Sequence, residues 1–111
     1  MNPLLGTILK LAVTASVVGA NVHLSDEQVD FSCTFWAKNG LKRRLTLTKS
    51  AEPDDPHMIE ESADCYIAVI DTSILGRGEY WMDMEVTIPD SDVDTGVRVE
   101  RVRVYTGVRV S

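Results

Sequence analysis

The chain has 111 residues and a mass of 12.3 kDa, with 44% hydrophobic, 25% charged and 6% aromatic residues. This size allows one compact domain, expected over residues 1–111, and the composition excludes long disordered or collagen-like segments. The 11 Lys and Arg against 17 Asp and Glu give a net charge of −6, which excludes nucleic acid as the main partner because a phosphate backbone would be repelled.

The first apolar stretch, residues 4–20, has features of a signal peptide, with an acceptable cleavage site at residues 18–20. However, no basic residue precedes it, and Lys10 interrupts it. It is also too short and too polar to span a bilayer, so we expect no membrane segment. Alternation instead predicts a first β-strand whose apolar face consists of Leu9, Leu11 and Val13.

Alternation of apolar and polar residues recurs along the chain, and no segment shows a helical period over three turns. The alternating segments are residues 29–36, 44–48, 80–88 and 97–110. Residues 65–70 are apolar on both faces, which is typical of a central strand. These segments and the turn signals between them predict an all-β fold, a single immunoglobulin-like β-sandwich of about seven antiparallel strands.

Asn39-Gly40 lies between two alternating segments and predicts a β-hairpin. A strict two-residue turn would place the leucines of the second strand on the polar face. A three-residue loop at 38–40 keeps them buried and predicts two cross-strand pairs, Cys33 with Leu45 and Phe31 with Leu47.

The valines of the tail change parity along the strand. Val97 and Val99 stand at odd positions, whereas the later valines stand at even positions: Val102, Val104, Val108 and Val110. A β-bulge near Glu100 would bring both groups to one face, and we therefore expect a bulge there.

Residues 71–78 look like a corner that leads into a strand at Tyr80. This pattern resembles the tyrosine corner of immunoglobulin-like sandwiches, in which the tyrosine hydroxyl bonds back to the preceding turn. Met82 stands where an antibody domain has its second disulfide cysteine, so a true antibody-type domain is excluded. Cys33 and Cys65 lie in apolar strand-like segments, and we expect both to be reduced thiols.

The strongest metal candidate is the loop that carries Asp90, Asp92 and Asp94, because alternate carboxylates are typical of calcium loops. Gly96 is at the seventh loop position instead of the sixth, and Arg101 occupies the twelfth, where a bidentate Glu belongs. A polar turn between strands explains the three Asp residues better. Zinc is not supported either, because no Cys-x-x-Cys pair is present and the spacing of His23 and His57 fits no zinc site. We expect no metal and no cofactor.

No catalytic motif is present. The chain has no Gly-x-Ser-x-Gly elbow, and its cysteines lie in strands. Asp83 and Glu85 resemble a carboxylate pair of a glycosidase, but they stand on an outward strand face. Cross-strand ion pairs with Arg101 or Arg103 are the ordinary explanation, and we expect no enzyme.

Trp36 and Trp81 both fall at outward positions of their strands. Exposed aromatic rings serve sugar binding or protein contacts. We favour a protein interface, because no cluster of Asn, Asp and Gln accompanies either tryptophan along the chain.

Several short segments then suggest a family. They are residues 5–7, 9–11, 29–35, 66–72, 75–80, 88–92 and 96–98, together with the valine-rich tail. Their order resembles a family of small immunoglobulin-like β-sandwich proteins encoded by phages and prophages of gut bacteria. The middle part, residues 66–80, resembles the N-terminal domain of phage baseplate upper proteins. The resemblance implies a non-enzymatic virion component that anchors fibres or receptor-binding proteins to a baseplate or capsid, with no catalytic residue carried over.

We therefore expect a phage virion structural protein, an adaptor or attachment module for tail, baseplate or head fibres. Its partners would be other virion proteins and copies of itself, assembled in the host cytoplasm. The alternatives are a capsid-decorating immunoglobulin-like protein, a sugar- or calcium-binding sandwich module, and a cell-surface or periplasmic module should the N-terminus be cleaved. The interface candidates are the N-terminal strand and a set of apolar residues: Trp36, Trp81, Val102, Val104, Val108 and Val110.

Overall fold

The computed structural model describes residues 2–15, 22–38, 44–49 and 54–111. These residues form seven strands and one short helix, which confirms the expected all-β fold. In chain order the elements are β1 (Ile8–Thr14), β2 (Asp30–Ala37), β3 (Arg44–Thr48), β4 (Met58–Ser62), β5 (Cys65–Asp71), α1 (Thr72–Leu75), β6 (Gly78–Pro89) and β7 (Val97–Val110).

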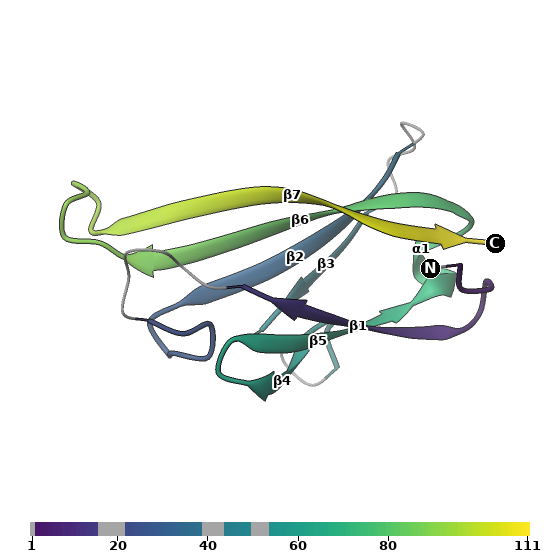
Figure 1. Cartoon of the computed structure of the whole chain (residues 1–111), viewed down its shortest axis with the longest axis horizontal. Coiled ribbons are helices and arrows are strands. Elements are labelled where there is room, and N and C mark those ends of the chain that lie inside the picture. The colour runs from purple at the N-terminus through teal and green to yellow at the C-terminus, as the bar shows by residue number, and fades with distance from the viewer. Residues whose placement is uncertain (1, 16–21, 39–43, 50–53) are drawn as a thin grey trace.

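The strands form two antiparallel sheets that lie face to face (Figure 1). One sheet has the order β1-β5-β4, and the other has the order β3-β2-β6-β7. β5 is the middle strand of its sheet, as its apolar sequence predicts. The molecule is elongated, with extents of 45 × 27 × 22 Å, because the hairpin of β6 and β7 is the longest element and follows the long axis.

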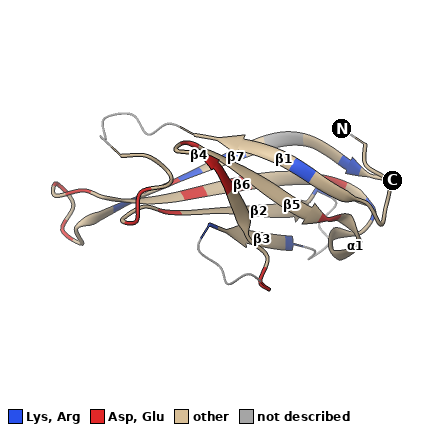
Figure 2. Ribbon diagram, turned by 90° about the horizontal axis from the view of Figure 1, so that it is seen from below, with Lys and Arg blue, Asp and Glu red and all other residues tan. Residues whose placement is uncertain are grey.

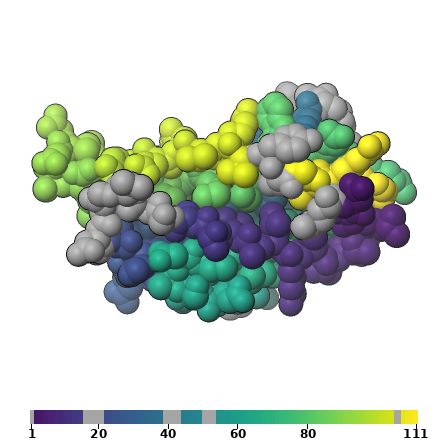
Figure 3. All heavy atoms as spheres, in the orientation of Figure 1, coloured from purple at the N-terminus to yellow at the C-terminus, as the bar shows by residue number. Residues whose placement is uncertain are grey.

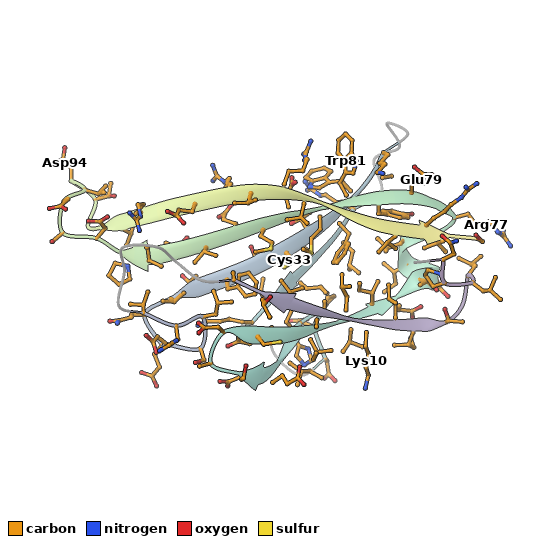
Figure 4. All side chains as sticks on the ribbon, viewed as in Figure 1. Lys10, Cys33, Arg77, Glu79, Trp81 and Asp94 are labelled. Carbon is orange, nitrogen blue, oxygen red and sulfur yellow. The ribbon has the colours of Figure 1, made fainter. Side chains whose placement is uncertain are left out.

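The core lies between the sheets and follows from the period of two in each strand. In β1, Leu9, Leu11 and Val13 point toward the core, as predicted, and Lys10 points away from it (Figure 4). The largest fully buried side chains come from both sheets and the loops between them: Tyr80, Phe35, Leu24, Leu47, Met58, Ile70, Leu75 and Ile88. Each such side chain contributes about 1.5–3 kcal/mol through burial.

The predicted register of the β2–β3 hairpin is wrong by two residues. The structure pairs Cys33 with Leu47 and Phe35 with Leu45. A shift of two residues leaves every side chain on the same face, so burial of the leucines does not distinguish the two registers. The turn itself, with Asn39-Gly40, lies outside the described residues.

The bulge predicted near Glu100 is also wrong. Pairing between β6 and β7 runs without a break from Val97 to Val104, and the register shifts only between Tyr80 and Met82 of β6. The parity change has a different cause, because Val97 and Val99 point to the outer face of the sheet and are 42% and 45% exposed. The two groups of valines therefore lie on opposite faces.

The tyrosine corner is present. The hydroxyl of Tyr80 donates to the carbonyl oxygen of Leu75 at 2.5 Å and to that of Gly76 at 2.8 Å. The hydroxyl has a single proton, which these two carbonyls at the end of α1 share. These contacts fix the angle at which the chain leaves β5 and enters β6.

The two chain ends lie together at one end of the molecule. The N–H of Leu5 donates to the carbonyl of Ser111 at 2.8 Å, and the N–H of Ser111 donates to the carbonyl of Pro3 at 3.0 Å. The buried hydroxyl of Thr72 donates to the carbonyl of Thr7 at 2.7 Å. The entry to β1 is therefore held against the end of β7, and the outer edge of β7 is covered at that end.

Candidate functional site

The outer face of the four-stranded sheet carries both tryptophans. Trp36 on β2 lies directly opposite Trp81 on β6, and both side chains are half-buried. Trp81 points away from the core (Figure 4), as its sequence position predicts. The two rings therefore stand side by side on one exposed surface instead of in the core.

An ion-pair ladder continues this face toward β7. Arg103 donates from Nε to Asp83 Oδ1 at 2.7 Å and from Nη2 to Oδ2 at 3.0 Å, a two-point contact. Arg101 Nε donates to Glu85 Oε2 at 2.7 Å. These are the cross-strand pairs that the sequence predicts. The hydrogen bond from Arg103 holds the pKa of Asp83 below its ordinary value, so Asp83 remains ionised and bound at neutral pH.

Arginine side chains also cover the two rings. The guanidinium carbon of Arg103 lies 4.7 Å from the ring centroid of Trp81, and that of Arg44 lies 5.3 Å from the centroid of Trp36. Both distances are within the range of cation–π attraction. Arg103 therefore binds a carboxylate and an aromatic ring of the same strand, β6, and attaches β7 to it.

A hollow of about 520 Å³ opens on this face beside Trp36. Polar side chains from three strands surround the ring there: Ser32, Thr34, Asp83, Glu85, Arg101 and Arg103. The indole Nε1 of Trp36 is buried on this face, near the carboxylate of Asp83. Of the three residue types considered in the sequence, Asn, Asp and Gln, Asp83 alone lines the hollow among the described residues. The polar residues of β2, β6 and β7 are distant from one another in the chain, and only the sheet brings them together.

The predicted valines of β7 have two different environments. Val108 and Val110 lie in the core, with 1% and 2% of their surface exposed, so their side chains offer no surface to a partner. Val104 is half-buried against the core, and Val102 is 55% exposed. The interface hypothesis for this strand therefore moves to its first half.

The first half of β7 is an exposed sheet edge. β7 is the last strand of its sheet, and in the described part of the chain β6 is its only strand partner. In Figure 3 the strand follows the upper rim of the molecule. Val97 and Val99, which the sequence analysis did not select, add exposed apolar surface to that of Val102. The sequence signal for these two valines is their odd position in the strand. It indicates side chains on the outer face of the sheet and not a β-bulge.

The acidic loop between β6 and β7 forms a turn (Figure 2). Asp90 Oδ1 accepts the N–H of Asp92 at 2.9 Å, and Asp90 Oδ2 lies 3.6 Å from Arg98 Nη1. Asp92 and Asp94 are exposed, with Asp94 at the tip of the loop (Figure 4). In the described part of the chain, no three His, Cys, Asp or Glu side chains gather as a metal site would require. Calcium is accordingly not part of the function proposed below.

The histidines and cysteines are dispersed. His23 Nδ1 lies 2.9 Å from Asp64 Oδ2, and the contact raises the pKa of His23. The Nδ1 of His57 lies 2.7 Å from the carbonyl oxygen of Asp55. Cys33 is buried, and burial raises the pKa of its thiol to about 12; Cys65 is half-buried on the other sheet, and both thiols are free.

The outer face of the three-stranded sheet is more apolar. Ile8 and Ile59 on this sheet are 58% and 50% exposed, and Ile74 of α1 is 59% exposed. A second hollow of about 310 Å³ lies beside Ile59 and Ile74, and β3 of the other sheet also contributes to it. Acidic side chains at its margin, Asp54, Asp55 and Asp71, accompany these isoleucines. The molecule therefore has exposed apolar residues on both sheets.

In comparisons with known proteins, the chain matches no family model, no curated protein and no solved structure. Within the described residues, none of the helical structure is long and apolar enough to cross a membrane.

Proposed function

We propose that this chain is a non-enzymatic structural adaptor of a phage particle, built on an immunoglobulin-like sandwich. The strand order supports this fold assignment. The sheet β3-β2-β6-β7 corresponds to strands C′-C-F-G of such domains, and β1-β5-β4 corresponds to B-E-D. The tyrosine corner at the start of β6 is at the E–F corner, where that fold has it. In this correspondence the first strand, A, has no counterpart among the described residues.

The first half of β7 is the observation that carries the adaptor function. β7 has 14 residues, and an exposed edge strand of this length presents backbone donors and acceptors to a strand of another chain. Natural sheets blunt such edges with charged side chains, proline, short length or a covering segment. Residues 97–103 contain no proline, and their charged side chains have both signs and form ion pairs within the sheet: Arg98, Glu100, Arg101 and Arg103. The exposed side chains of Val97, Val99 and Val102 add apolar contact area.

The other edge strand of this sheet, β3, has only five residues, and Thr48 at its end forms a parallel bridge with His57. It therefore offers fewer backbone groups than β7. This difference makes β7 the preferred edge for strand addition, with other virion proteins as the partners and the host cytoplasm as the place of assembly. A capsid-decorating role would use the same edge and differs only in the position of the partner.

Mass spectrometry of purified phage particles from a culture that encodes the chain tests this proposal. We expect its peptides in the particles, in a constant ratio to the major capsid protein. Val99→Pro should reduce incorporation, whereas Val99→Thr, which retains the N–H, should not. Absence of the chain from intact particles would contradict the virion role.

A saccharide-binding module is the second candidate, and the hollow beside Trp36 favours it. An aromatic face next to hydroxyl, carboxylate and guanidinium groups suits the apolar face and the hydroxyls of a sugar ring. Calorimetric titration with a panel of mono- and oligosaccharides tests it. Binding that Trp36→Ala abolishes and Trp81→Phe preserves would support the module, and no heat with any sugar at millimolar concentration would reject it.

A further inference from the structure

The direction of the backbone groups of β7 follows from the turn that precedes it. The N–H of Asp90 donates to the carbonyl of Gly96 at 3.0 Å, so these two residues form a hydrogen-bonded pair. Hydrogen-bonded and non-hydrogen-bonded pairs alternate along an antiparallel ladder. The even residues of β7 after the turn therefore direct their N–H and C=O groups to β6. The odd residues direct theirs to the open edge: Val97, Val99, Arg101 and Arg103.

The opposite side of β6 agrees with this assignment. The N–H of Lys38 donates to the carbonyl of Glu79 at 2.9 Å. The backbone groups of this odd residue of β6 therefore point toward β2. The pairing of β2 with β6 then continues without a shift from Ala37 to Asp30. The N–H and C=O groups of the even residues of β6 consequently point toward β7. This agrees with the hydrogen bond between Asp90 and Gly96 at the turn.

We infer that a second copy of this chain pairs with the open edge of β7 in antiparallel orientation, with Val99 opposite Val99 of the partner subunit. This inference rests on the proposed docking role of β7 and names its occupant. A twofold axis that joins two identical edges makes the contact self-complementary. Because only odd residues direct their N–H and C=O groups to the edge, odd residues must stand opposite odd residues, and a twofold axis beside any one residue of β7 meets this condition.

Charge selects Val99 among these positions. An axis at Arg98 or Glu100 would place that side chain against its own copy, and an axis at Val102 would place Arg101 opposite Arg103 of the partner subunit. An axis at Arg101 or Arg103 would place each arginine against its own copy, and like charges directly opposite are destabilising. An axis at Val97 would bring the β6–β7 turn into the ladder. With the axis at Val99, Arg98 lies opposite Glu100 of the partner subunit, and the symmetry repeats this opposite-charge pair.

The exposure of these side chains permits the contact. Val99 is 45% exposed, and the side chains of Arg98 and Glu100 are 35% and 46% exposed. Within each chain Arg98 is held only at 3.6 Å from Asp90 and from Glu100, and its Nε has no hydrogen-bond acceptor among the described residues. This Nε is buried, so a carboxylate of a second chain would contact the exposed part of the Arg98 side chain.

Light scattering of the purified protein across a concentration series tests the pairing. We expect the mass to rise from 12.3 kDa toward twice that value. Glu100→Arg should keep the protein monomeric, because arginine would then face Arg98 of the partner subunit. The double variant Arg98→Glu/Glu100→Arg should restore the dimer. Glu27→Arg makes the same charge change in an exposed loop and should leave the dimer unchanged.

Circular dichroism establishes that each variant is folded. Val99→Pro is a second probe of the pairing, because it removes one N–H from the open edge and none from the ladder with β6. A protein that stays at 12.3 kDa at every concentration, or a dimer that Glu100→Arg does not weaken, would overturn the inference. A trimer or larger ring would also overturn it. These outcomes leave the adaptor role intact, because that role is decided separately by the presence of the chain in particles.

Discussion

Arg103 contacts Trp81 and Asp83 at the same time, with its guanidinium carbon 4.7 Å from the indole centroid and two hydrogen bonds to the carboxylate. Both contacts lie on the outer face of the sheet and join β7 to β6. The outer edge of β7 can therefore remain uncovered without loss of the strand. The same arrangement makes the face next to that edge rigid and charged.

This cluster predicts that Arg103→Lys lowers the melting temperature. Lysine keeps the charge but loses the planar fork that reaches both carboxylate oxygens and stacks on the ring. We also expect a change in tryptophan fluorescence, because the cover over Trp81 changes. Arg109→Lys, on the same strand, is the matched control. Equal melting curves and spectra for the two variants would contradict a role of Arg103 in holding β7.

The tyrosine corner predicts a larger effect at a buried site. Tyr80→Phe should lower the free energy of unfolding by about 1–3 kcal/mol, because the buried carbonyl of Leu75 loses its hydrogen bond. Urea denaturation measures this change. Tyr66→Phe removes a hydroxyl from a ring that packs 5.7 Å from Phe31, and it should cost less. If both variants lose the same stability, the corner has no special role.

The contact of His23 with Asp64 predicts a pH dependence. Asp64 raises the pKa of His23 from its ordinary value of 6.5, so this contribution is complete below pH 6.5 and disappears as the pH rises through the higher, folded value. His23 in turn lowers the pKa of Asp64 from 3.8, so the carboxylate contribution is complete above pH 3.8 and disappears as the pH falls through the lower value.

The pair should therefore stabilise the fold most between pH 3.8 and 6.5. Thermal melts of the wild type and of His23→Gln should differ most in this window and converge above it. A difference that grows toward alkaline pH would reverse the predicted sign.

The two cysteines should react at different rates with iodoacetamide. Burial raises the pKa of Cys33 to about 12, so very little thiolate is present at neutral pH and the thiol is shielded from the reagent. Cys65 is half-buried, and desolvation and Glu61 raise its pKa as well, so it should react first but slowly. Mass spectrometry of the native protein gives the order, and early labelling of Cys33 would contradict its place in the core.

Calcium should not change the stability. The carboxylate of Asp90 is engaged by the N–H of Asp92, and Arg98 lies near it. Thermal melts with calcium and with a chelator should coincide. A bound ion at 100 times its dissociation constant would add about 2.7 kcal/mol, and such a rise would establish a calcium module.

The period of two in the sequence is sufficient to predict six of the seven strands and the pairing of Asp83 and Glu85 with the arginines of β7. It does not predict β4, because every residue of Met58–Ser62 after the first is exposed and the segment has no alternation. It does not determine the hairpin register, because Leu45 is buried in both registers that differ by two residues. The hollow beside Trp36 is not visible in the sequence either, because three strands contribute to it. The exposure of Val99 depends on the lack of a neighbouring strand, a property of the whole sheet.

Hydrogen exchange of the β7 amides, measured by NMR at low and high protein concentration, tests whether the first half of β7 is an open edge that a second chain covers. At low concentration the amides of Val97, Val99 and Arg101 should exchange rapidly, and the intervening amides, which bond to β6, should exchange slowly. At high concentration the odd amides should become protected as well. Protection of the odd amides at every concentration, or rapid exchange of the even ones, would show that β7 does not present the open edge on which the account depends.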